Sequence, residues 1–323
     1  MSHVNVLVVL PVTGDRCERL ASAFPDASFS FVSPRDLTAG DLSAVEVVVG
    51  NVPPRLLASA SRLRWVQLGS AGADSYVAPG VLDDSVVLTS CSGAYGQAVS
   101  EHVFAMVLAV QKKLELYRDD QRAGVWGEEG EVSSPLGANV LVIGTGDIGG
   151  HFGRLATAFG AHVTGARRKV GECPEGFERV IPMERIPDVV SRMDVIAGFV
   201  PSTPGTRHLV DADLLARCRR GVIVANGGRG DLIVTDDLVD ALVSGQVGAA
   251  ALDVTDPEPL PAGHPLWTLG NALVTPHVSG FWHLPVTLDN VCAICSDNLA
   301  RFSRGEPLRN VVEHETSPAG RSM

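Results

Sequence analysis

Short, unbroken apolar runs recur along the chain and alternate with stretches in which apolar residues follow a helical spacing. A run of about four to eight residues rich in Val and Ile is typical of a strand buried on both faces. Strands that alternate with helices favour a parallel α/β sheet. We therefore expect strands at residues 4–10, 45–49, 63–68, 86–88, 139–143, 161–165, 194–199, 221–225, 249–254 and 272–275.

The helical patterns divide the chain into two blocks. The strands from residue 139 onward, with the helices between them, form a complete doubly wound block. A last helical pattern ends at Gly305 and precedes a short strand-like run at 308–312. We expect this last segment to return to the first block, which is then discontinuous in sequence. Helices are predicted at residues 98–119, 211–218, 235–244 and 285–304.

Composition narrows the class of protein. A chain of 323 residues with 45% hydrophobic and 20% charged residues can form two globular domains, each with its own core. The formal net charge of −11 disfavours nucleic acid and anionic membranes as partners. The apolar runs are too short to span a bilayer, and the first residues lack the basic region of a signal peptide. We therefore expect a cytoplasmic protein.

Six cysteines in a chain of this length are too few for a disulfide scaffold. Cys292 and Cys295 have C-x-x-C spacing, but they lie in a helical pattern without a second pair of ligands nearby. We interpret them as helix packing residues and predict no metal site.

A glycine motif, G-T-G-D-I-G, follows directly after the predicted strand at 139–143 and opens a helical pattern. In a dinucleotide site the first glycine permits the tight turn, the second lets the backbone approach a pyrophosphate, and the third lets helix pack on strand. The N–H groups at the start of the helix then face the anion. We expect the acidic residue in the motif to point away from the phosphates and to serve the helix terminus. The predicted cofactor residues here are Gly144, Thr145, Gly146, Asp147, Ile148 and Gly149.

The end of the next strand indicates which nicotinamide cofactor is preferred. An NAD site usually carries an acidic residue there for the ribose hydroxyls, whereas arginine suits the 2′-phosphate of NADP. In this chain the strand runs into Arg167 and Arg168, followed by Lys169. We predict that NADP(H) is preferred, with NAD(H) as the alternative cofactor.

Three polar residues follow predicted strands of the second block. Arg229 lies in an N-G-G-R-G loop, and its planar, permanently charged group suits a substrate carboxylate. His277 follows a strand in a T-P-H segment, and histidine is the natural proton donor near neutral pH. Glu258 can orient the ring and favour its protonated form. Because the carboxyl ends of parallel strands share one edge, we expect these three catalytic residues to lie together.

These motifs together resemble those of the D-isomer-specific 2-hydroxyacid dehydrogenases over nearly the whole chain. The residues that carry the resemblance are the G-T-G-D-I-G turn, the N-G-G-R-G loop at Asn226, L-D-V-T-D-P-E-P-L at Leu252 and T-P-H at Thr275. Weaker matches are T-P-G-T-R-H at Thr203 and S-E-H at Ser100.

The resemblance implies a fold class and a domain division. The fold is α/β, with two Rossmann-like doubly wound domains that have parallel sheets and the active site in the cleft between them. Residues 1–97 and 285–323 then form the substrate-binding domain, and residues 98–284 form the dinucleotide-binding domain. A homodimer joined through the cofactor domains is the usual assembly of the family.

The resemblance also implies roles for individual residues. Arg229 binds the substrate carboxylate and carbonyl, His277 is the acid/base and Glu258 its partner. Asp253 hydrogen-bonds the nicotinamide carboxamide, and Thr206 and Val99 line the cofactor cleft. The backbone N–H groups of a loop in the first block bind the substrate carboxylate; its residues are Ser70, Ala71, Gly72 and Ala73, followed by Asp74.

The function predicted is NADPH-preferring reduction of a small 2-oxo acid, such as glyoxylate or hydroxypyruvate, to the D-2-hydroxy acid. Two departures leave alternatives open. Arg167 stands where NAD-using members have an acid, and Phe281 and Trp282 place bulky rings near the pocket. The alternatives are a specialised biosynthetic dehydrogenase with an unusual substrate and a binding protein that senses the nicotinamide state. Glu258 argues against formate oxidation, for which related enzymes pair the histidine with glutamine, and phosphite oxidation stays a remoter alternative.

Overall fold

The computed structural model describes residues 3–313, which fall into two compact units. Unit 1 comprises Met1–Tyr95 and Trp282–Met323, and unit 2 comprises Gly96–Phe281. The chain therefore leaves unit 1 and returns to it. The predicted boundaries after residues 97 and 284 lie a few residues further along the chain.

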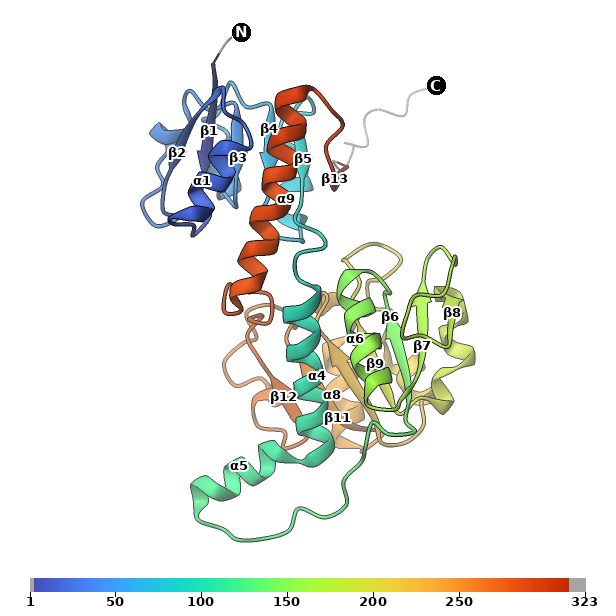
Figure 1. The fold of residues 1–323 in the computed structure, drawn as a ribbon. Helices are drawn as coiled ribbons and strands as arrows, with labels where there is room; N and C mark the ends of the chain where they lie inside the picture. Colours follow the sequence, from blue (N-terminus) through green and yellow to red (C-terminus); the bar gives the residue numbers. More distant parts are fainter. Residues whose placement is uncertain (1–2, 314–323) are drawn as a thin grey trace. The chain divides into compact units, whose positions relative to one another are not determined.

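Unit 1 contains a six-stranded sheet in the described part of the chain, in the order β13-β5-β4-β3-β1-β2 (Figure 1). The first five strands along the chain pair in parallel, and β13 pairs antiparallel to β5 at one edge. The strands are β1 (Val4–Val8), β2 (Ala27–Phe31), β3 (Val47–Val49), β4 (Trp65–Gln67), β5 (Val87–Thr89) and β13 (Val311–Val312). The helices are α1 (Asp15–Ser22), α2 (Pro54–Leu57), α3 (Asp74–Val77) and α9 (Pro285–Arg304), with a 3₁₀ turn at Ala39–Leu42.

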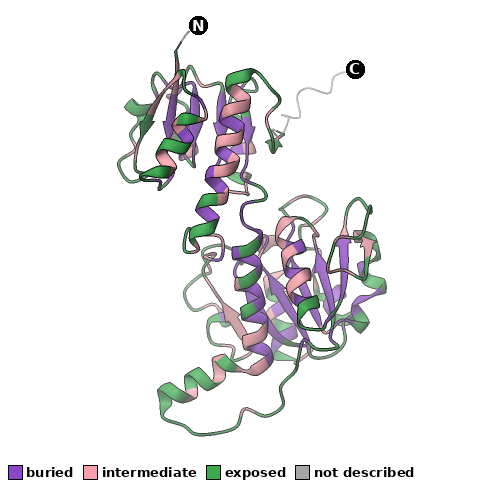
Figure 2. Ribbon diagram, viewed as in Figure 1, coloured by how far each residue is buried: buried purple, intermediate pink, exposed green. Residues whose placement is uncertain are grey.

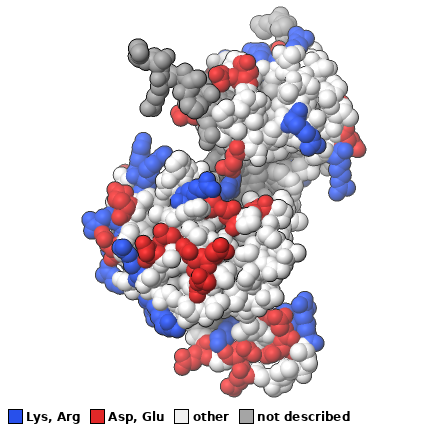
Figure 3. All heavy atoms as spheres, turned by 180° about the vertical axis from the view of Figure 1, so that it is seen from behind, with Lys and Arg blue, Asp and Glu red and all other residues white. Residues whose placement is uncertain are grey.

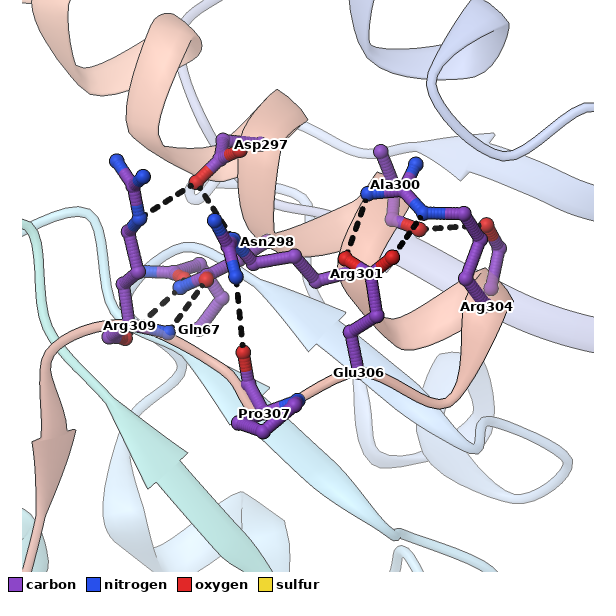
Figure 4. Close-up of polar contacts among 10 residues, drawn as sticks. Gln67, Asp297, Asn298, Ala300, Arg301, Arg304, Glu306, Pro307 and Arg309 are labelled. Atoms are coloured by element: carbon purple, nitrogen blue, oxygen red, sulfur yellow. Dashed lines mark hydrogen bonds and ion pairs between the residues drawn. The ribbon is translucent and has the colours of Figure 1, made fainter.

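A buried amide anchors the returning helix α9 to the sheet of unit 1. The Nδ2 of Asn298 donates to Gln67 Oε1 at 2.7 Å and to the carbonyl oxygen of Arg309 at 3.0 Å, and its Oδ1 accepts from the Arg309 N–H at 2.8 Å (Figure 4). Around it, Asp297 bonds Arg301 at 2.9 Å and lies 3.2 Å from Arg309 (Figure 4). These contacts tie α9, the turn after it and β4 into one cluster.

Unit 2 contains a seven-stranded, fully parallel sheet in the described residues, in the order β12-β11-β10-β9-β6-β7-β8. Helices pack on this sheet, and its central strands β6, β9 and β10 are mostly apolar and buried. The strands are β6 (Asn139–Ile143), β7 (His162–Arg167), β8 (Arg179–Pro182), β9 (Val195–Gly198), β10 (Val222–Asn226), β11 (Val247–Leu252) and β12 (Ala272–Val274). The helices are α4 (Gly96–Lys112), α5 (Leu114–Ala123), α6 (Asp147–Ala158), α7 (Ala212–Arg217) and α8 (Thr235–Val243), with 3₁₀ turns at Met183–Asp188, Val190–Arg192, Gly230–Leu232 and Pro265–Trp267.

Every predicted strand overlaps a strand of the structure, and β2 and β8 were missed. Both are edge strands whose residues are at most half-buried, so they lack the continuous apolar run of a central strand. The fold class of two α/β units with parallel sheets is confirmed, apart from the antiparallel edge strand β13.

The predicted helix at 98–119 is wrong as a single element. Lys113 has a left-handed backbone conformation, with φ of 56°, which ends α4 and starts α5 in a new direction. Ten residues of α4 are buried, whereas none of α5 is (Figure 2). The helical spacing of apolar residues continues across Lys113, which is why the sequence predicted one helix. Only α4 packs against the sheet of unit 2.

Candidate active site

Three segments leave the sheet of unit 2 at one edge because their strands are parallel neighbours. Asn226 at the end of β10 pairs with Leu252 at the end of β11, and Leu252 pairs with Val274 at the end of β12. The N–H of Asp253 donates to the carbonyl oxygen of Asn226 at 3.0 Å. The segments after residues 226, 252 and 274 therefore begin side by side at this edge.

The buried side chain of Asn226 shapes the loop that carries Arg229. Its Nδ2 donates to the carbonyl oxygen of Arg229 at 2.8 Å, and its Oδ1 accepts from the N–H of Gly228 at 3.1 Å. A Cβ at Gly230 would collide with the carbonyl of Thr255, so glycine lets this loop lie against the segment after β11. Arg229 is half-buried, and its Nη1 donates to the carbonyl oxygen of Gly228 at 2.9 Å.

The structure pairs His277 with Glu258. The Nδ1 of the imidazole lies 2.7 Å from Glu258 Oε1, and both side chains are a little over two-fifths exposed, at 43% and 44%. A carboxylate can only accept, so Nδ1 is the donor and Nε2 is left to exchange a proton with a ligand. The pair therefore has the arrangement that an acid/base group requires.

Asp253 holds the loop on which His277 lies. Its carbonyl oxygen accepts from the His277 N–H at 2.7 Å. Its carboxylate accepts from Thr275 Oγ1 at 2.6 Å, from the Val278 N–H at 3.0 Å, and from both the N–H and the hydroxyl of Ser279. In the loop 275–279 only Pro276, which has no N–H, makes no bond to Asp253.

These bonds stabilise an unusual backbone. His277 has a φ of 51°, a left-handed conformation that costs a residue with a side chain about 1–3 kcal/mol. The bonds to Asp253 offset this cost and present the imidazole to Glu258. Asp253 is only 1% exposed, and its predicted contact with the nicotinamide carboxamide stays a prediction. Sequence reasoning missed Thr275 and Ser279, although their positions on either side of His277 were a usable signal.

The glycine turn between β6 and α6 fits a dinucleotide. Gly144 has a φ of 92°, and a Cβ at Gly149 would collide with the carbonyl oxygen of Gly144. A Cβ at Gly146, in contrast, would meet nothing within 4 Å. The first and third glycines are therefore required by the turn itself, whereas the second leaves open space where the predicted role places a pyrophosphate. Ile148 is half-buried in the first turn of α6.

The end of β7 lies beside this turn. The N–H of Gly144 donates to the carbonyl oxygen of Ala166 at 2.8 Å, directly before Arg167. The Nη2 of Arg167 donates to the carbonyl oxygen of Glu172 at 2.6 Å, and Arg168 is exposed. Within residues 3–313, two buried donors here have no hydrogen-bond partner, Arg167 Nε and Thr145 Oγ1. Unsatisfied buried donors are rare, and these two fit an anionic ligand at this position.

Asp147 lies against α4. A Cβ at Gly96 would collide with Asp147 Oδ1 and with the ring of His151, and Oδ1 lies 3.5 Å from His151 Nδ1. The other carboxylate oxygen, Oδ2, is buried without a hydrogen-bond partner in the described chain. Asp147 therefore faces α4 and the next turn of α6, and its predicted role at the helix terminus stays a prediction.

Two other predicted cofactor residues lie within unit 2. Thr206 closes the turn after β9, where its hydroxyl donates to the carbonyl oxygen of Pro201 at 2.6 Å and its Oγ1 accepts from the Thr203 N–H at 3.0 Å. Val99 on α4 is buried beneath Gly227 of the N-G-G-R-G loop. Their contact with a cofactor stays a prediction.

The predicted substrate loop belongs to unit 1. Asn51 Nδ2 donates to Ser70 Oγ at 2.9 Å, and Ser70 Oγ donates to the carbonyl oxygen of Gly72 at 2.6 Å. The ring of Trp282 lies near that of Tyr95, with centroids 6.3 Å apart, and approaches Gly69 before the loop. Ala71 and Ala73 are half-buried. The loop is therefore internally braced, and its role toward a substrate stays a prediction.

Other features of the described residues bear on the predicted partners. No helix there is long and apolar enough to cross a membrane, and no group of three His, Cys, Asp or Glu side chains could hold a metal ion. Lys and Arg side chains lie among Asp and Glu side chains on the face drawn in Figure 3. Cys292 and Cys295 are buried in α9, as expected for helix packing residues, and the latter lies 3.7 Å from Cys91.

A doubly wound unit with a glycine-rich turn, together with a histidine–carboxylate pair at the carboxyl edge of its sheet, defines a nicotinamide-dependent dehydrogenase. Residues 104–279, more than half of the chain, match the family described as D-isomer specific 2-hydroxyacid dehydrogenase, NAD binding domain. The chain belongs to the D-isomer specific 2-hydroxyacid dehydrogenase family, as its motifs predicted, and is an oxidoreductase of that family.

Three relatives show how similar the chain is to known proteins. The hydroxypyruvate reductase of Blautia hydrogenotrophica is 37% identical over 177 residues, which are 54% of this chain and 53% of that protein. A solved D-isomer specific 2-hydroxyacid dehydrogenase family protein from Aeromonas salmonicida is 31% identical, with a TM-score of 0.85, over 97% of this chain and 100% of that one. The NADPH-dependent glyoxylate/hydroxypyruvate reductase of Sinorhizobium meliloti, solved with NADP and sulfate, is 28% identical, with a TM-score of 0.79, over 96% and 98%.

Proposed function

We propose that this protein is an NADPH-preferring reductase of a small 2-oxo acid, such as glyoxylate or hydroxypyruvate, and forms the D-2-hydroxy acid. The observation that carries the proposal is the 2.7 Å hydrogen bond between His277 and Glu258 at the sheet edge that Arg229 shares. The glyoxylate and hydroxypyruvate reductases among the relatives support the substrate class.

Each polar residue at this edge of the sheet has its own role in the proposed reaction. NADPH, when bound, supplies the hydride that the carbonyl carbon gains. His277 gives the proton on Nε2 to the carbonyl oxygen, and Glu258 stabilises the imidazolium before that transfer. The guanidinium of Arg229 holds the substrate carboxylate, for which charge-assisted bonds contribute about 1.5–3 kcal/mol each. The loop of residues 70–73 is our candidate for further contacts to that carboxylate.

The preference for NADPH rests on Arg167, Arg168 and Thr145. The arginine side chains stand at the end of β7, where an acid would favour NAD, and the unpartnered donors at Arg167 and Thr145 suit a phosphate. The NADP complex of the Sinorhizobium meliloti relative supports the same assignment. NAD(H) remains the alternative cofactor.

The test is NADPH oxidation, followed by absorbance, with the purified protein and a panel of 2-oxo acids. We expect turnover on glyoxylate or hydroxypyruvate, and a D-configured product by chiral chromatography. Turnover only on aromatic or other bulky 2-oxo acids would indicate a specialised dehydrogenase, for which Trp282 beside Gly69 is the structural argument. Tight NADPH binding without turnover on any compound would indicate a nicotinamide sensor.

We also propose that the protein is a homodimer and that α5 with the segment after it forms the contact. Figure 1 shows this part extending away from the sheet of unit 2. It exposes apolar side chains that pack on no core, with Leu114 55% exposed and Trp126 fully exposed. Light scattering should give a dimer for the wild type and a monomer for Leu114→Ser combined with Trp126→Ser. The control, Trp267→Ser at a half-exposed tryptophan elsewhere in unit 2, should stay dimeric.

A further inference from the structure

A second histidine contacts the loop that carries His277. His102 lies on α4, which packs beside β11 and β12 (Figure 1). Its Nε2 is 3.1 Å from Thr275 Oγ1 and 3.8 Å from Asp253 Oδ1, and its side chain is 31% exposed. The S-E-H segment that contains His102 was a weaker family match, and the function proposed above gives it no role.

The hydrogen-bond geometry shows which atom donates in this contact. The Thr275 hydroxyl has one proton, and its strongest acceptor is Asp253 Oδ1 at 2.6 Å, well ahead of the sulfur of Met106 at 3.6 Å. Once that proton is committed to the carboxylate, Thr275 Oγ1 can only accept from His102. The Nε2 of His102 must therefore carry a hydrogen.

This donor completes a chain of contacts that reaches His277. The bond from His102 holds the Thr275 hydroxyl in line with the Asp253 carboxylate. The carboxylate in turn accepts from the N–H groups of Val278 and Ser279, which follow His277 directly. The four bonds that the carboxylate accepts all come from neutral N–H and hydroxyl groups of the loop 275–279.

We propose that His102 is a positioning residue: through Thr275 and Asp253 it holds the loop 275–279 in the conformation that directs the His277 imidazole. This rests on the proposed function insofar as His277 is the acid/base. His102 acts on where His277 lies and not on the glycine turn, so its loss lowers kcat much more than it weakens NADPH binding.

The experiment compares two substitutions of matched size. Glutamine places an N–H donor at nearly the same reach as Nε2, whereas leucine fills the space without a donor. We expect His102→Leu to lower kcat about 10- to 100-fold, the range caused by a misplacement of about 1 Å. His102→Gln should keep kcat within a few-fold of wild type, and both variants should bind NADPH with a Kd within a few-fold of wild type by fluorescence titration.

A second readout does not depend on turnover. Amide hydrogen exchange of the peptide that contains residues 275–279 should be faster in His102→Leu than in wild type, and close to wild type in His102→Gln. Thr275→Val removes the hydroxyl through which His102 acts on Asp253. In that background, adding His102→Leu should lower kcat no further. If the two substitutions instead lower kcat by factors that multiply, the proposal is wrong.

The outcomes separate this inference from the proposed function. If wild type reduces 2-oxo acids and His102→Leu matches it in kcat, the positioning role is wrong and the proposed function stands. If His102→Leu and His102→Gln lower kcat equally, the positioning role is also wrong. If wild type reduces no 2-oxo acid, the proposed function fails, and unchanged exchange in the loop would then overturn the positioning role by itself.

Discussion

The Oε1 atom of Glu258 lies 2.7 Å from Nδ1 of His277, although the two residues are 19 positions apart in the chain. This contact uses Nδ1 of the imidazole, so Nε2 is the nitrogen left for the proposed proton transfer. It joins the segment after β11 to the segment after β12, two neighbours in a parallel sheet. The proposed chemistry follows from this relationship more directly than from any single motif.

Replacement of His277 tests that chemistry. His277→Ala should lower kcat by about 10²–10⁴-fold, the usual contribution of a positioned acid/base group. NADPH binding should be unchanged, because the glycine turn is untouched. Glu258→Gln keeps an oxygen that accepts from Nδ1 but removes the charge that stabilises the imidazolium. We therefore expect its kcat to lie between those of wild type and His277→Ala. Steady-state kinetics with the best 2-oxo acid measures both, and wild-type turnover in His277→Ala would rule out its role.

Replacement of the arginines at the end of β7 tests cofactor preference. Arg167→Asp combined with Arg168→Ala removes two cations and introduces the acid that favours the ribose hydroxyls of NADH. Loss of charge-assisted bonds of about 1.5–3 kcal/mol predicts NADPH binding weaker by about 10- to 100-fold, with NADH binding unchanged or improved. The measurement is kcat/KM for both cofactors, with Lys169→Ala as the exposed neighbouring control. Equal selectivity before and after would contradict the assignment.

Asn298 offers a test of how α9 is anchored in unit 1. Asn298→Ala removes three hydrogen bonds and leaves the buried Gln67 with one partner fewer. We expect the free energy of unfolding to fall by about 1–3 kcal/mol, the penalty for buried polar groups that lose their partners. Urea denaturation followed by tryptophan fluorescence measures it. Ser303→Ala, which removes an exposed hydroxyl of the same helix, should change it by less than about 0.5 kcal/mol.

Alkaline pH should weaken the fold through buried thiols. Burial raises the pKa of Cys218 and of Cys292 to about 11, above the value of about 8.5 for an unfolded thiol. The folded state therefore holds these protons more tightly, and the stability they contribute is complete below about pH 8.5 and lost as pH rises to about 11. Urea denaturation at several pH values should show a shallower decline in Cys218→Ala combined with Cys292→Ala. The exposed control Cys173→Ala should decline as steeply as wild type.

Much of the fold could be predicted from short patterns of apolar residues in the sequence. Central strands such as β6 and β10 are buried on both faces, so their apolar runs appear directly in the sequence. The edge strands β2 and β8 are less buried and carry no such signal. The break at Lys113 was also invisible, because the apolar spacing runs through it and only the packing of α4 on unit 2 ends the helix.

The sequence by itself determined the family, the glycine turn and the three polar residues after neighbouring strands, because each depends on residue types at short spacing. Only the tertiary structure showed the hydrogen bonds that hold the loop behind the predicted pair of His277 and Glu258. The contact from His102 to Thr275 spans 173 positions of the chain, and that from Asp253 to Ser279 spans 26. Such bonds form only after strand order and helix docking bring distant segments together, and no local pattern encodes that order.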